Sequence, residues 1–479
     1  MTRWLAALAA VTLLRLIVAA LAPLAPDEAY YWVWSHALAA SYVDHPGMVA
    51  LWIRIGTAIA GDSALGIRLL GPISGAIGSV LLWDAAERLL PGRNAGVWAA
   101  ALLNATLLFG VGTVIMTPDT PLLFFWTAAL WALVRIGTGR DLGWWVLAGL
   151  CAGLAMASKY TAVFLWAGVA LWLAWVPALR RQWLRPGPWV GAAVGALVFL
   201  PVVLWNARHD WAGFLRQGGR VADWQPARAL TFLGELIGGQ FGLATPLIAV
   251  LCAAGLVIAT RRAWQARDPA PTLLVALTLP PALVFLQHAL GDRVQGNWPA
   301  ILYPAGCIAA MLCTHRAWLR LRRPALALGL GVTLLAYLQA TTFALPIPPR
   351  RDPIALQLAG WPTLAAEVAD AANATRARFV VADQYALASE LAHDLPGHLP
   401  VLAVDPRWAL TNLPPEATGD AIGLLVRDRR RTDPIGPAWQ DPTPAGVASR
   451  PGVQDFTLTL VRLGPELAPV RLPRPAQQR

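Results

Sequence analysis

Long apolar segments separated by short polar loops recur along the first 345 residues of the chain. Because a helix needs about 20 apolar residues to cross about 30 Å of hydrocarbon, this pattern predicts eleven membrane-spanning helices. Their expected ranges are 4–25, 62–83, 95–115, 121–137, 143–157, 160–178, 188–205, 231–259, 271–290, 299–314 and 325–345. The range 143–157 is short, so its merger with the next range stays open. The first range carries Arg15 and lacks a clear cleavage site, so we interpret it as an anchor and not as a signal peptide.

The composition indicates that a bilayer is the solvent for this region. Hydrophobic residues make up 57% of the 479 positions, charged residues make up only 14%, and the mean hydropathy is +0.52. These values are too apolar for two or three ordinary soluble domains. We therefore expect an α-helical polytopic membrane protein.

The net charge of +11 is divided unevenly between two alternating sets of loops. One set holds fourteen arginines: Arg88, Arg93, Arg135, Arg140, Arg180, Arg181, Arg185, Arg261, Arg262, Arg267, Arg316, Arg320, Arg322 and Arg323. The other set holds seven basic residues: Arg54, Lys159, Arg208, Arg216, Arg220, Arg228 and Arg293. Because basic residues concentrate in cytoplasmic loops, the first set and the N-terminus with Arg3 are predicted to be cytoplasmic. Eleven crossings then place the C-terminal tail outside, in the periplasm of a bacterium, and the charge does not require a nucleic-acid partner.

Most polar groups suited to chemistry lie in five segments on the predicted outer side: 26–61, 117–121, 158–160, 205–229 and 291–298. Within the first of them, residues 29–40 and 48–60 have apolar and aromatic side chains at helical spacing. Aromatic rings concentrate at the level of the lipid headgroups. We therefore predict two amphipathic helices lying in the membrane interface.

The tail has a different pattern. Prolines at 346, 348, 349, 353 and 362 predict a stiff linker, and the segments 378–382, 386–393 and 399–404 predict strand, helix and strand. Further strands are expected near 422–426 and 456–462, and the arginine cluster 427–431 is interpreted as a solvated turn and not as a ligand site. We expect a transmembrane catalytic domain over residues 1–345 and a small soluble α/β domain over 346–479.

Asp27 and Glu28 follow the first span directly and precede an aromatic run that includes Tyr30. A carboxylate at the lip of a low-dielectric bundle, near cationic partners, can be tuned to accept a proton from a hydroxyl. The alternative is helix capping, because acidic residues are common at helix starts. We predict Asp27 and Glu28 as catalytic residues and Tyr30 as a substrate contact.

Two further outer segments carry carboxylates in turns. Asp44 and His45 are adjacent, so they suit either a metal, a phosphate or a simple capping role. Asp119 lies in a turn between Pro118 and Pro121, where turn chemistry alone accounts for an aspartate. We predict Asp119 as catalytic and the other two as substrate-binding residues.

Lys159 is the only lysine among 38 basic residues, and it lies at the junction of two predicted spans. Lysine is a compact, rotatable point charge whose pKa shifts readily, unlike that of arginine, and charges within membranes are candidates for function. A lysine that only anchors the chain at the interface is the alternative. We predict that Lys159 and the neighbouring Tyr160 bind substrate.

The remaining outer loops are basic and rich in hydrogen-bonding groups. Asn206, Arg208 and His209 in one loop and Arg293 and Asn297 in another are predicted to hold an anionic headgroup, because phosphate favours arginine. Binding of ordinary acidic lipids would give the same pattern. Arg15 and Arg68 lie within predicted spans, where internal pairing or snorkelling accounts for them.

The cysteines give no sign of a disulfide framework or of a cysteine-based metal site. Cys151, Cys252, Cys307 and Cys313 all lie in predicted spans, and the tail has none. A divalent cation near Asp44 and His45 remains an open question, and the metal site is therefore unknown. No glycine-rich phosphate-binding loop of a nucleotide site is present in the sequence.

Six motifs in a fixed order give the chain a resemblance to a known family. They are PDEAYYW, YVDHPGM, TPDTPLLFFW, ASKYTAVF, WNARHDW and GNWPA, and they extend from about Pro26 to Tyr303. In this order they resemble the bacterial members of glycosyltransferase family 39, the protein mannosyltransferase-like group. The chain is more distantly similar to the aminoarabinose transferase that modifies lipid A, which has an acidic residue, lysine and proline where this chain has Asp44, His45 and Pro46.

The resemblance implies a GT-C architecture that receives a polyprenyl-phosphate sugar from the outer leaflet. It implies transfer of a hexosyl or pentosyl group, with inversion, to an envelope glycolipid, polysaccharide or protein, with Asp27 in the place of the proposed base. From charge and side of the membrane, we expect Lys159, Arg208 and Arg293 to face the lipid phosphate. This interpretation requires acidic and cationic side chains from distant segments to share one outward-facing cavity.

Two other classes of function stay open from the sequence. One is a transporter or flippase for a lipid-linked or anionic substrate, in which Asp119 and Lys159 form an ion-coupling pair. Transporters usually contain repeats and helices broken at the midplane, whereas the polar groups here collect on one predicted side. The other class is a scaffold whose exported tail binds a partner.

Overall fold

The computed structural model describes residues 2–92, 94–137, 141–219, 224–431 and 433–475. Arg93, Arg140 and Arg220, which belong to the loop sets above, lie outside the described residues. Up to residue 219 the helices are α1 (Thr2–Leu21), α2 (Pro26–Ser35), α3 (Met48–Ala60), α4 (Ala64–Arg68), α5 (Leu70–Leu89), α6 (Ala95–Asn104), α7 (Leu107–Gly112), α8 (Asp119–Leu133), α9 (Leu142–Met156), the 3₁₀ helix η1 (Tyr160–Ala162), α10 (Val163–Trp175), η2 (Pro177–Leu184), α11 (Pro186–Arg208) and α12 (Ala212–Gly218). They are followed by η4 (Pro226–Arg228), α13 (Ala229–Leu243), α14 (Pro246–Gln265), α15 (Pro269–His288), η5 (Trp298–Leu302), α16 (Tyr303–Ala309), η6 (Ala310–Leu312) and α17 (Arg316–Thr342).

The described chain forms two compact units, neither of which is continuous in sequence. The first contains Met1–Ile17, Ala40–Val49 and Leu70–Leu335, and the second contains Val18–Ala39, Ala50–Leu69 and Ala336–Arg479. The C-terminal tail therefore folds together with α2, α4 and most of α3. The expected domain boundary after residue 345 stays a prediction.

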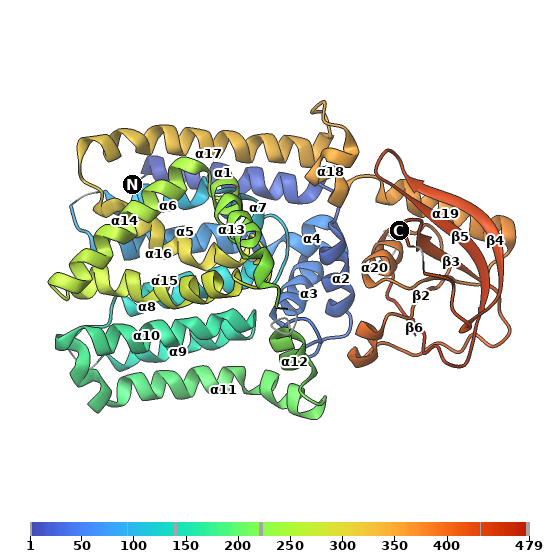
Figure 1. Cartoon of the computed structure of the whole chain (residues 1–479), viewed down its shortest axis with the longest axis horizontal. Coiled ribbons are helices and arrows are strands. Elements are labelled where there is room, and N and C mark those ends of the chain that lie inside the picture. The colour runs from blue at the N-terminus through green and yellow to red at the C-terminus, as the bar shows by residue number, and fades with distance from the viewer. Residues whose placement is uncertain (1, 93, 138–140, 220–223, 432, 476–479) are drawn as a thin grey trace. The chain divides into compact units, whose positions relative to one another are not determined.

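The first unit is a helical bundle, in which α9, α10 and α11 lie side by side (Figure 1). Small residues allow α9 and α11 to approach closely. A Cβ atom added to Gly149 would lie 2.0 Å from the carbonyl oxygen of Gly191, and one on Gly153 would lie 2.6 Å from that of Gly195. Such contacts are favoured between helices in membranes, where apolar side chains gain little by leaving lipid. They fix α9, whose C-terminal end leads into Lys159.

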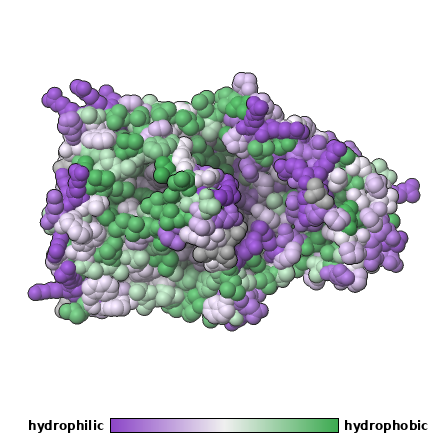
Figure 2. All heavy atoms as spheres, in the orientation of Figure 1, coloured by the Kyte–Doolittle hydropathy of each residue, from purple (hydrophilic) through white to green (hydrophobic). Residues whose placement is uncertain are grey.

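Among the described residues, six helices are long and apolar enough to cross a bilayer: Thr2–Leu21, Ala64–Leu89, Pro186–Arg208, Pro246–Gln265, Pro269–His288 and Arg316–Thr342. The segments 160–175 and 177–184, bent by 115° at their junction, would add a seventh. Figure 2 shows mainly hydrophobic side chains, in green, along the bundle helices and hydrophilic side chains, in purple, at their left-hand ends. The prediction of a multi-pass helical membrane protein is confirmed, although several of the expected spans correspond to shorter or broken helices.

The expected span 231–259 is wrong, because two helices occupy this range. Helix α13 ends at Leu243 and α14 begins at Pro246, with Thr245 between them at φ +65° and ψ 148°. The residue before a proline is disfavoured in helical conformation, and proline suits the first helical position. Apolar composition alone does not register this break. The expected range 95–115 is also divided, into α6 and α7.

The two helices expected in the first outer segment are present as α2 and α3, but α2 is buried from Glu28 to Ser35 and packs against α20, so its aromatic rings do not lie on an exposed interfacial face. Helix α2 begins at Pro26, three residues earlier than predicted, and ends at Ser35. Glu28 closes its first turn by accepting a hydrogen bond from the backbone nitrogen of Ala25 at 3.0 Å. The short spans 143–157 and 160–178 do not merge, because Lys159 has extended backbone (φ −157°, ψ 138°) between α9 and η1.

The tail contains η7 (Pro349–Arg351), α18 (Pro353–Leu358), α19 (Trp361–Thr375), β1 (Val380–Ala382), α20 (Tyr385–Asp394), β2 (Val401–Ala403), η8 (Pro406–Leu410), β3 (Gly423–Asp428), β4 (Trp439–Arg450), β5 (Gln454–Leu463) and β6 (Val470–Arg471). In the described residues the strands form one six-stranded sheet of order β4-β5-β3-β1-β2-β6. Strand β1 pairs in parallel with β2 and β3, and the other pairs are antiparallel. Helices α19 and α20 pack against the sheet, so the predicted α/β tail is confirmed.

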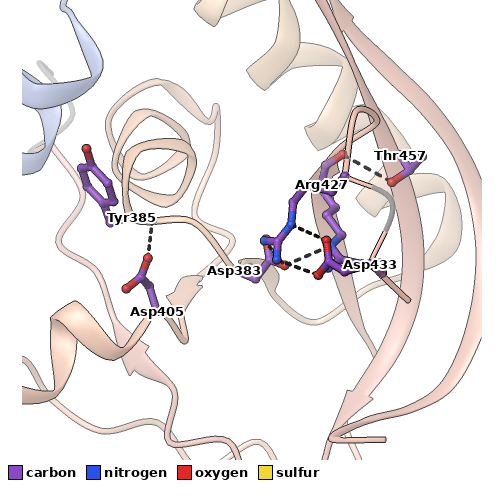
Figure 3. A network of polar contacts seen from close by, with 7 residues as sticks. Asp383, Tyr385, Asp405, Arg427, Asp433 and Thr457 are labelled. Atoms are coloured by element: carbon purple, nitrogen blue, oxygen red, sulfur yellow. Dashed lines mark hydrogen bonds and ion pairs between the residues drawn. The ribbon is translucent and has the colours of Figure 1, made fainter. Parts of the chain in front are cut away.

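Two details of the tail differ from expectation. Pro353 and Pro362 lie in the first turns of α18 and α19 and not in a stiff linker, because proline has the φ that a first helical turn needs. The predicted solvated turn is present at the exposed residues Arg429 and Arg430, whereas Arg427 is only 9% exposed and contacts Asp383 and Asp433 in an ion-pair network (Figure 3). Arg431, which also contacts Asp433, holds the pKa of that carboxyl below its usual range. The network joins β1, β3 and the loop after β3, which explains the cluster without a ligand.

Candidate active site

Three predicted site residues from distant segments meet in the first unit. The ammonium nitrogen of Lys159 lies 2.7 and 2.8 Å from the two carboxylate oxygens of Asp119. The side-chain nitrogen of Asn297 donates to Asp119 Oδ2 at 2.7 Å. The side chains of Lys159 and Asp119 are 9% and 16% exposed. The side chains of this pair are therefore mostly buried, but each keeps some exposed surface.

Local structure explains how these groups are presented. Asp119 is the first residue of α8, where the helix dipole favours a negative charge. Lys159 leaves α9 in extended conformation, while its backbone nitrogen still donates to the carbonyl oxygen of Ala155 at 2.9 Å. Asn297 directly precedes η5. Three helix ends thus supply one carboxylate, one ammonium group and one amide.

Tyr160 extends the cluster into a second group of polar contacts. Its hydroxyl lies 3.2 Å from the hydroxyl of Ser41 and accepts a hydrogen bond from the amide of Asn206 at 3.4 Å. Asn206 is fully buried, and its side-chain oxygen Oδ1 accepts a hydrogen bond from the backbone nitrogen of Phe214 at 3.1 Å. This geometry indicates that Asn206 holds the loop between α11 and α12 in place. Its assignment as a substrate contact remains a prediction.

Asp44 and His45 lie in the short segment that the first unit contains before α3. Asp44 is 6% exposed, and its carboxylate forms an ion pair with Arg216 of α12 at 3.5 Å. Its carbonyl oxygen accepts a hydrogen bond from Gln217. The backbone carbonyl of His45 accepts from Tyr42, which closes a turn. These contacts tie the segment to α12.

The other predicted cations have separate surroundings. Arg293 makes a bidentate ion pair with Glu235 of α13, at 2.7 and 2.8 Å, and both side chains are largely exposed. The imidazole of His209 stacks on Trp205 with ring centroids 4.1 Å apart. Arg208 is exposed at the end of α11. Neither arginine contacts the Asp119 carboxylate.

The adjacent acids Asp27 and Glu28 have different environments in the second unit. Glu28 is fully buried and forms a bidentate ion pair with Arg68 at 2.6 and 2.7 Å. Arg68 therefore has the internal pairing expected from the sequence. Asp27, one residue earlier, is exposed at the first turn of α2. This geometry favours a structural role for Glu28 and leaves Asp27 accessible to a substrate.

The sequence interpretation missed the residues of the tail that surround α2. The Tyr385 hydroxyl donates to Asp27 Oδ1 at 3.3 Å, and the Tyr385 ring lies 4.6 Å from that of Tyr30. Tyr30 also packs edge-on against Trp408 at 5.0 Å. One signal was available: Tyr385 is the only tyrosine after residue 345, as Lys159 is the only lysine of the chain.

No cluster of three or more His, Cys, Asp or Glu side chains able to hold a metal is found within the described part of the chain. A cavity of about 550 Å³ is lined by Trp98, Leu319, Arg316, Arg320, Arg322 and Arg323. Its arginines belong to the loops predicted to be cytoplasmic, and it shares no residue with the Asp119 cluster. It is therefore not the candidate active site.

Comparison with known proteins supports a relationship to membrane glycosyltransferases. A family model described as dolichyl-phosphate-mannose-protein mannosyltransferase matches residues 44–205, a range that includes Asp44, Asp119 and Lys159. The lipid A galacturonosyltransferase RgtD of Rhizobium johnstonii is 29% identical over 417 residues, covering 83% of this chain and 85% of the relative. The undecaprenyl phosphate-alpha-4-amino-4-deoxy-L-arabinose arabinosyl transferase of Pseudomonas aeruginosa is 30% identical over 348 residues, covering 65% and 60% respectively.

The fold comparison covers nearly the whole chain. The crystal structure of ArnT from Cupriavidus metallidurans bound to undecaprenyl phosphate matches with a TM-score of 0.65 at 14% identity, covering 96% of this chain and 98% of that one. The chain has the GT-C fold. The resemblance and architecture expected from the six ordered motifs are thus confirmed. At this identity the match establishes the fold, whereas the roles of Asp27, Asp119 and Lys159 rest on the geometry above.

Proposed function

We propose that this GT-C protein is a glycosyltransferase that moves a sugar from a polyprenyl-phosphate donor to an envelope glycolipid of the lipid A class, with inversion. Its similarity to lipid A galacturonosyl and aminoarabinosyl transferases, over 83% and 65% of the chain, supports this substrate class. The solved structure of similar fold holds undecaprenyl phosphate, which supports the donor class. The reaction needs no nucleotide, because the phosphate of the lipid carrier is the leaving group.

The observation that carries the proposal is the contact of Lys159 with Asp119, whose carboxylate also accepts a hydrogen bond from Asn297. Lysine has three N–H donors, and the partners of Lys159 within the described chain are the two oxygens of Asp119. One donor and part of the positive charge therefore remain for a ligand. A cation held in this way can stabilise the negative charge that develops on a departing phosphate. Asp119 and Asn297 fix its position, so little reorganisation is needed during the reaction.

The proposed chemical step is a direct displacement. Asp27 accepts the proton of an acceptor hydroxyl, and the hydroxyl oxygen forms a bond to the anomeric carbon of the donor sugar. The bond between that carbon and the phosphate oxygen breaks, and its electron pair stays with the polyprenyl phosphate. Lys159 faces this phosphate, and Arg208 and Arg293 are the further cations we assign to it. Arg293 would have to leave its ion pair with Glu235 before it could bind the phosphate.

Orientation in the membrane is also part of the proposal. The arginine-rich loops predict a cytoplasmic N-terminus in the bacterial inner membrane and a periplasmic tail. The sugar is then transferred on the periplasmic face, where both a polyprenyl-phosphate sugar and lipid A are available. Residues 1–345 would form the catalytic membrane domain and residues 346–479 the periplasmic domain.

Reconstituted full-length protein tests the proposal directly. Liposomes would contain lipid A and either the galacturonic acid or the 4-amino-4-deoxy-L-arabinose derivative of undecaprenyl phosphate, and mass spectrometry would detect modified lipid A. We expect transfer by the wild type and a loss of about a hundredfold or more in Asp27→Asn, as for removal of a general base. Movement of the donor across the bilayer without any transfer would instead support a flippase. Full turnover by Asp27→Asn would disprove the assigned base.

A further inference from the structure

A hydroxyl group of the C-terminal tail contacts the carboxylate of the proposed base. Tyr385 is the first residue of α20, and its hydroxyl donates to Asp27 Oδ1 at 3.3 Å although the two residues are 358 positions apart. In Figure 3 its ring extends away from Asp405 toward the blue ribbon of the N-terminal region. This distance is long for an O–H···O hydrogen bond. Such contacts commonly tighten when a substrate binds.

The Tyr385 ring is held by aromatic and cationic neighbours of the same unit. Tyr30, one turn along α2 from Asp27, lies 4.6 Å from it. The guanidinium of Arg407 lies over its face, 4.1 Å from the ring centroid. A cation over the ring is attracted by the ring's negative face, and its positive charge makes the phenol a stronger hydrogen-bond donor. The ring is thus fixed from two sides while its hydroxyl reaches Asp27.

Asp405 connects the segments that position this ring. Its Oδ2 accepts from the backbone nitrogen of Tyr385 at 3.2 Å, as Figure 3 shows. Its Oδ1 accepts from the backbone nitrogen of Arg407 at 2.9 Å. One carboxylate therefore caps both α20 and η8, the 3₁₀ helix that carries Arg407 and Trp408. These two hydrogen bonds hold the backbone on which the Tyr385 ring and its neighbours Arg407 and Trp408 are placed.

Deeper in the same packing, α20 faces the buried ion pair of α2 and α4. Glu390, five residues after Tyr385, is 1% exposed, and neither of its carboxylate oxygens has a hydrogen-bond partner among the described residues. Its electrostatic neighbours are Asp394 of α20, Arg450 of β4, and Glu28 and Arg68. Burial of a carboxyl group against this pair shows that α20 and α2 form one packed interior. The position of Tyr385 relative to Asp27 is consequently fixed by a core.

We propose that the C-terminal domain completes the catalytic apparatus by using Tyr385 to orient the Asp27 carboxylate toward the acceptor hydroxyl. Tyr385 is then a positioning residue that acts through Asp27. The proposal rests on the proposed transferase function and adds a role for the tail to it. The hydroxyl donates to the ionised carboxylate, so it keeps Asp27 in the form that accepts a proton. The Asp27 carboxylate would then already point toward the acceptor hydroxyl when the acceptor binds.

Tyr385→Phe tests this role, because phenylalanine keeps the ring contacts and removes only the hydroxyl. We expect kcat to fall about tenfold, with an unchanged KM for the donor, when one orienting interaction of the base is lost. The acidic limb of the pH profile should move upward, since the Asp27 carboxylate is easier to protonate without the hydrogen bond from Tyr385. In an Asp27→Asn background, Tyr385→Phe should cause little further loss. Ser389→Ala, which removes a hydroxyl one turn along α20, should leave kcat and the pH profile unchanged.

Arg407→Gln gives an intermediate case that a purely structural role of Tyr385 would not predict. It removes the cation from the ring face but retains the hydroxyl, so we expect a smaller shift of the acidic limb in the same direction. Wild-type kcat and an unchanged pH profile in Tyr385→Phe would overturn the proposal. So would an equal loss in the Asp27→Asn background, because the two residues would then act independently.

A measurement without turnover separates this proposal from the proposed function. Asp27 is exposed, so its reaction with a carbodiimide and an amine can be followed against pH by peptide mass spectrometry of the full-length protein. We expect Tyr385→Phe to move the pH midpoint of labelling at Asp27 upward. Absence of sugar transfer by the wild type, together with this shift, would refute the function but keep the contact. Normal transfer with identical labelling of both proteins would refute only the role of Tyr385.

Discussion

Two buried pairs of opposite charge differ in how completely their hydrogen-bonding groups are used. Glu28 and Arg68 in the second unit have no exposed side-chain surface. Asp119 and Lys159 in the first unit are 16% and 9% exposed. Both pairs are bidentate and short, so distance alone does not distinguish them. The two pairs differ in the exposed fraction of their side chains and in the other hydrogen-bond partners of the cation.

The N–H donors of the Arg68 guanidinium all have acceptors in the surrounding structure. Besides Glu28, it donates to the carbonyl oxygens of Ala19, Ala22 and Pro23 at 2.7 to 3.1 Å. These carbonyls belong to the end of α1 and the residues after it, which have no helical partner of their own. The pair therefore joins the end of α1, the start of α2 and the end of α4. A charge used in this way stabilises the fold and has no capacity left for a ligand.

Lys159 has the opposite character, because its partners in the described chain leave one donor over. In this protein, the number of hydrogen-bond donors already in use on a buried cation therefore separates a structural pair from a functional candidate. One substitution in each pair tests this difference, and a third, at Glu390 beside the pair of Glu28 and Arg68, has the smallest expected effect.

Arg68→Gln should strongly destabilise the protein. It leaves Glu28 buried without a compensating charge, which typically costs about 3–5 kcal/mol. We expect a large fall in the thermal unfolding temperature in detergent and in the amount of folded protein in membranes. The double variant Glu28→Gln with Arg68→Gln should recover part of the loss, because both charges are then removed. An Arg68→Gln protein as stable as the wild type would contradict the structural assignment.

Lys159→Gln should act mainly on catalysis. Loss of a cation that stabilises a leaving phosphate typically lowers kcat by about a hundredfold or more, while the partial exposure of this pair limits the effect on unfolding. Sugar transfer and thermal unfolding would be measured on the same preparation. Arg261→Gln, which removes an exposed charge from another loop, serves as the control. A loss of stability as large as that of Arg68→Gln would show that the two pairs are equivalent.

Glu390→Gln should produce the smallest effect and one that depends on pH. Burial raises the pKa of Glu390 well above its ordinary value, and the nearby Asp394 and Glu28 add to this, while Arg450 and Arg68 oppose it. The folded protein therefore keeps a proton that the unfolded chain releases above about pH 4.3. Stability from this group is present below that pH and is lost as the pH rises toward the folded pKa.

Glutamine cannot ionise, so the variant should match the wild type at about pH 4 and exceed its Tm by about 3 °C at about pH 8. Scanning fluorimetry across this range measures the difference. Glu367→Gln on α19, whose carboxylate accepts a hydrogen bond from the backbone nitrogen of Ser449, is measured beside it as a control substitution of the same type. A Tm difference for Glu390→Gln that does not change with pH would show that its burial does not control its protonation.

The positions of most helices and of the tail strands follow from local pattern. The predicted helix 48–60 is reproduced as α3, and the predicted strand 456–462 lies within β5. The ranges that differ are set by single residues that hydropathy does not weigh. Pro246 divides the expected span 231–259, whereas the expected separation of 143–157 from 160–178 is present, at the extended backbone of Lys159. Proline geometry was readable from the sequence, and it was not weighed against the apolar pattern.

Parts of the candidate site were also readable in advance. The single lysine, the acidic turn at Asp119 and the asparagine at 297 were each singled out from their residue type and position, and the structure brings them together. The separation of Asp27 from Glu28 was not readable, because adjacent acids look alike until Arg68 occupies one of them. Tyr385 was missed for a similar reason, since nothing near it in the chain indicates that α20 packs on α2.

By itself, the sequence determined that this chain lies in a membrane, that its polar chemistry gathers in a few loops and that its tail is an α/β domain. Hydropathy and periodicity are local properties, so the chain carries them in every short window. Only the tertiary structure decided which charge is saturated and which remains available, and which residue of the tail reaches Asp27. Those properties depend on contacts between positions up to 358 residues apart, which packing alone selects.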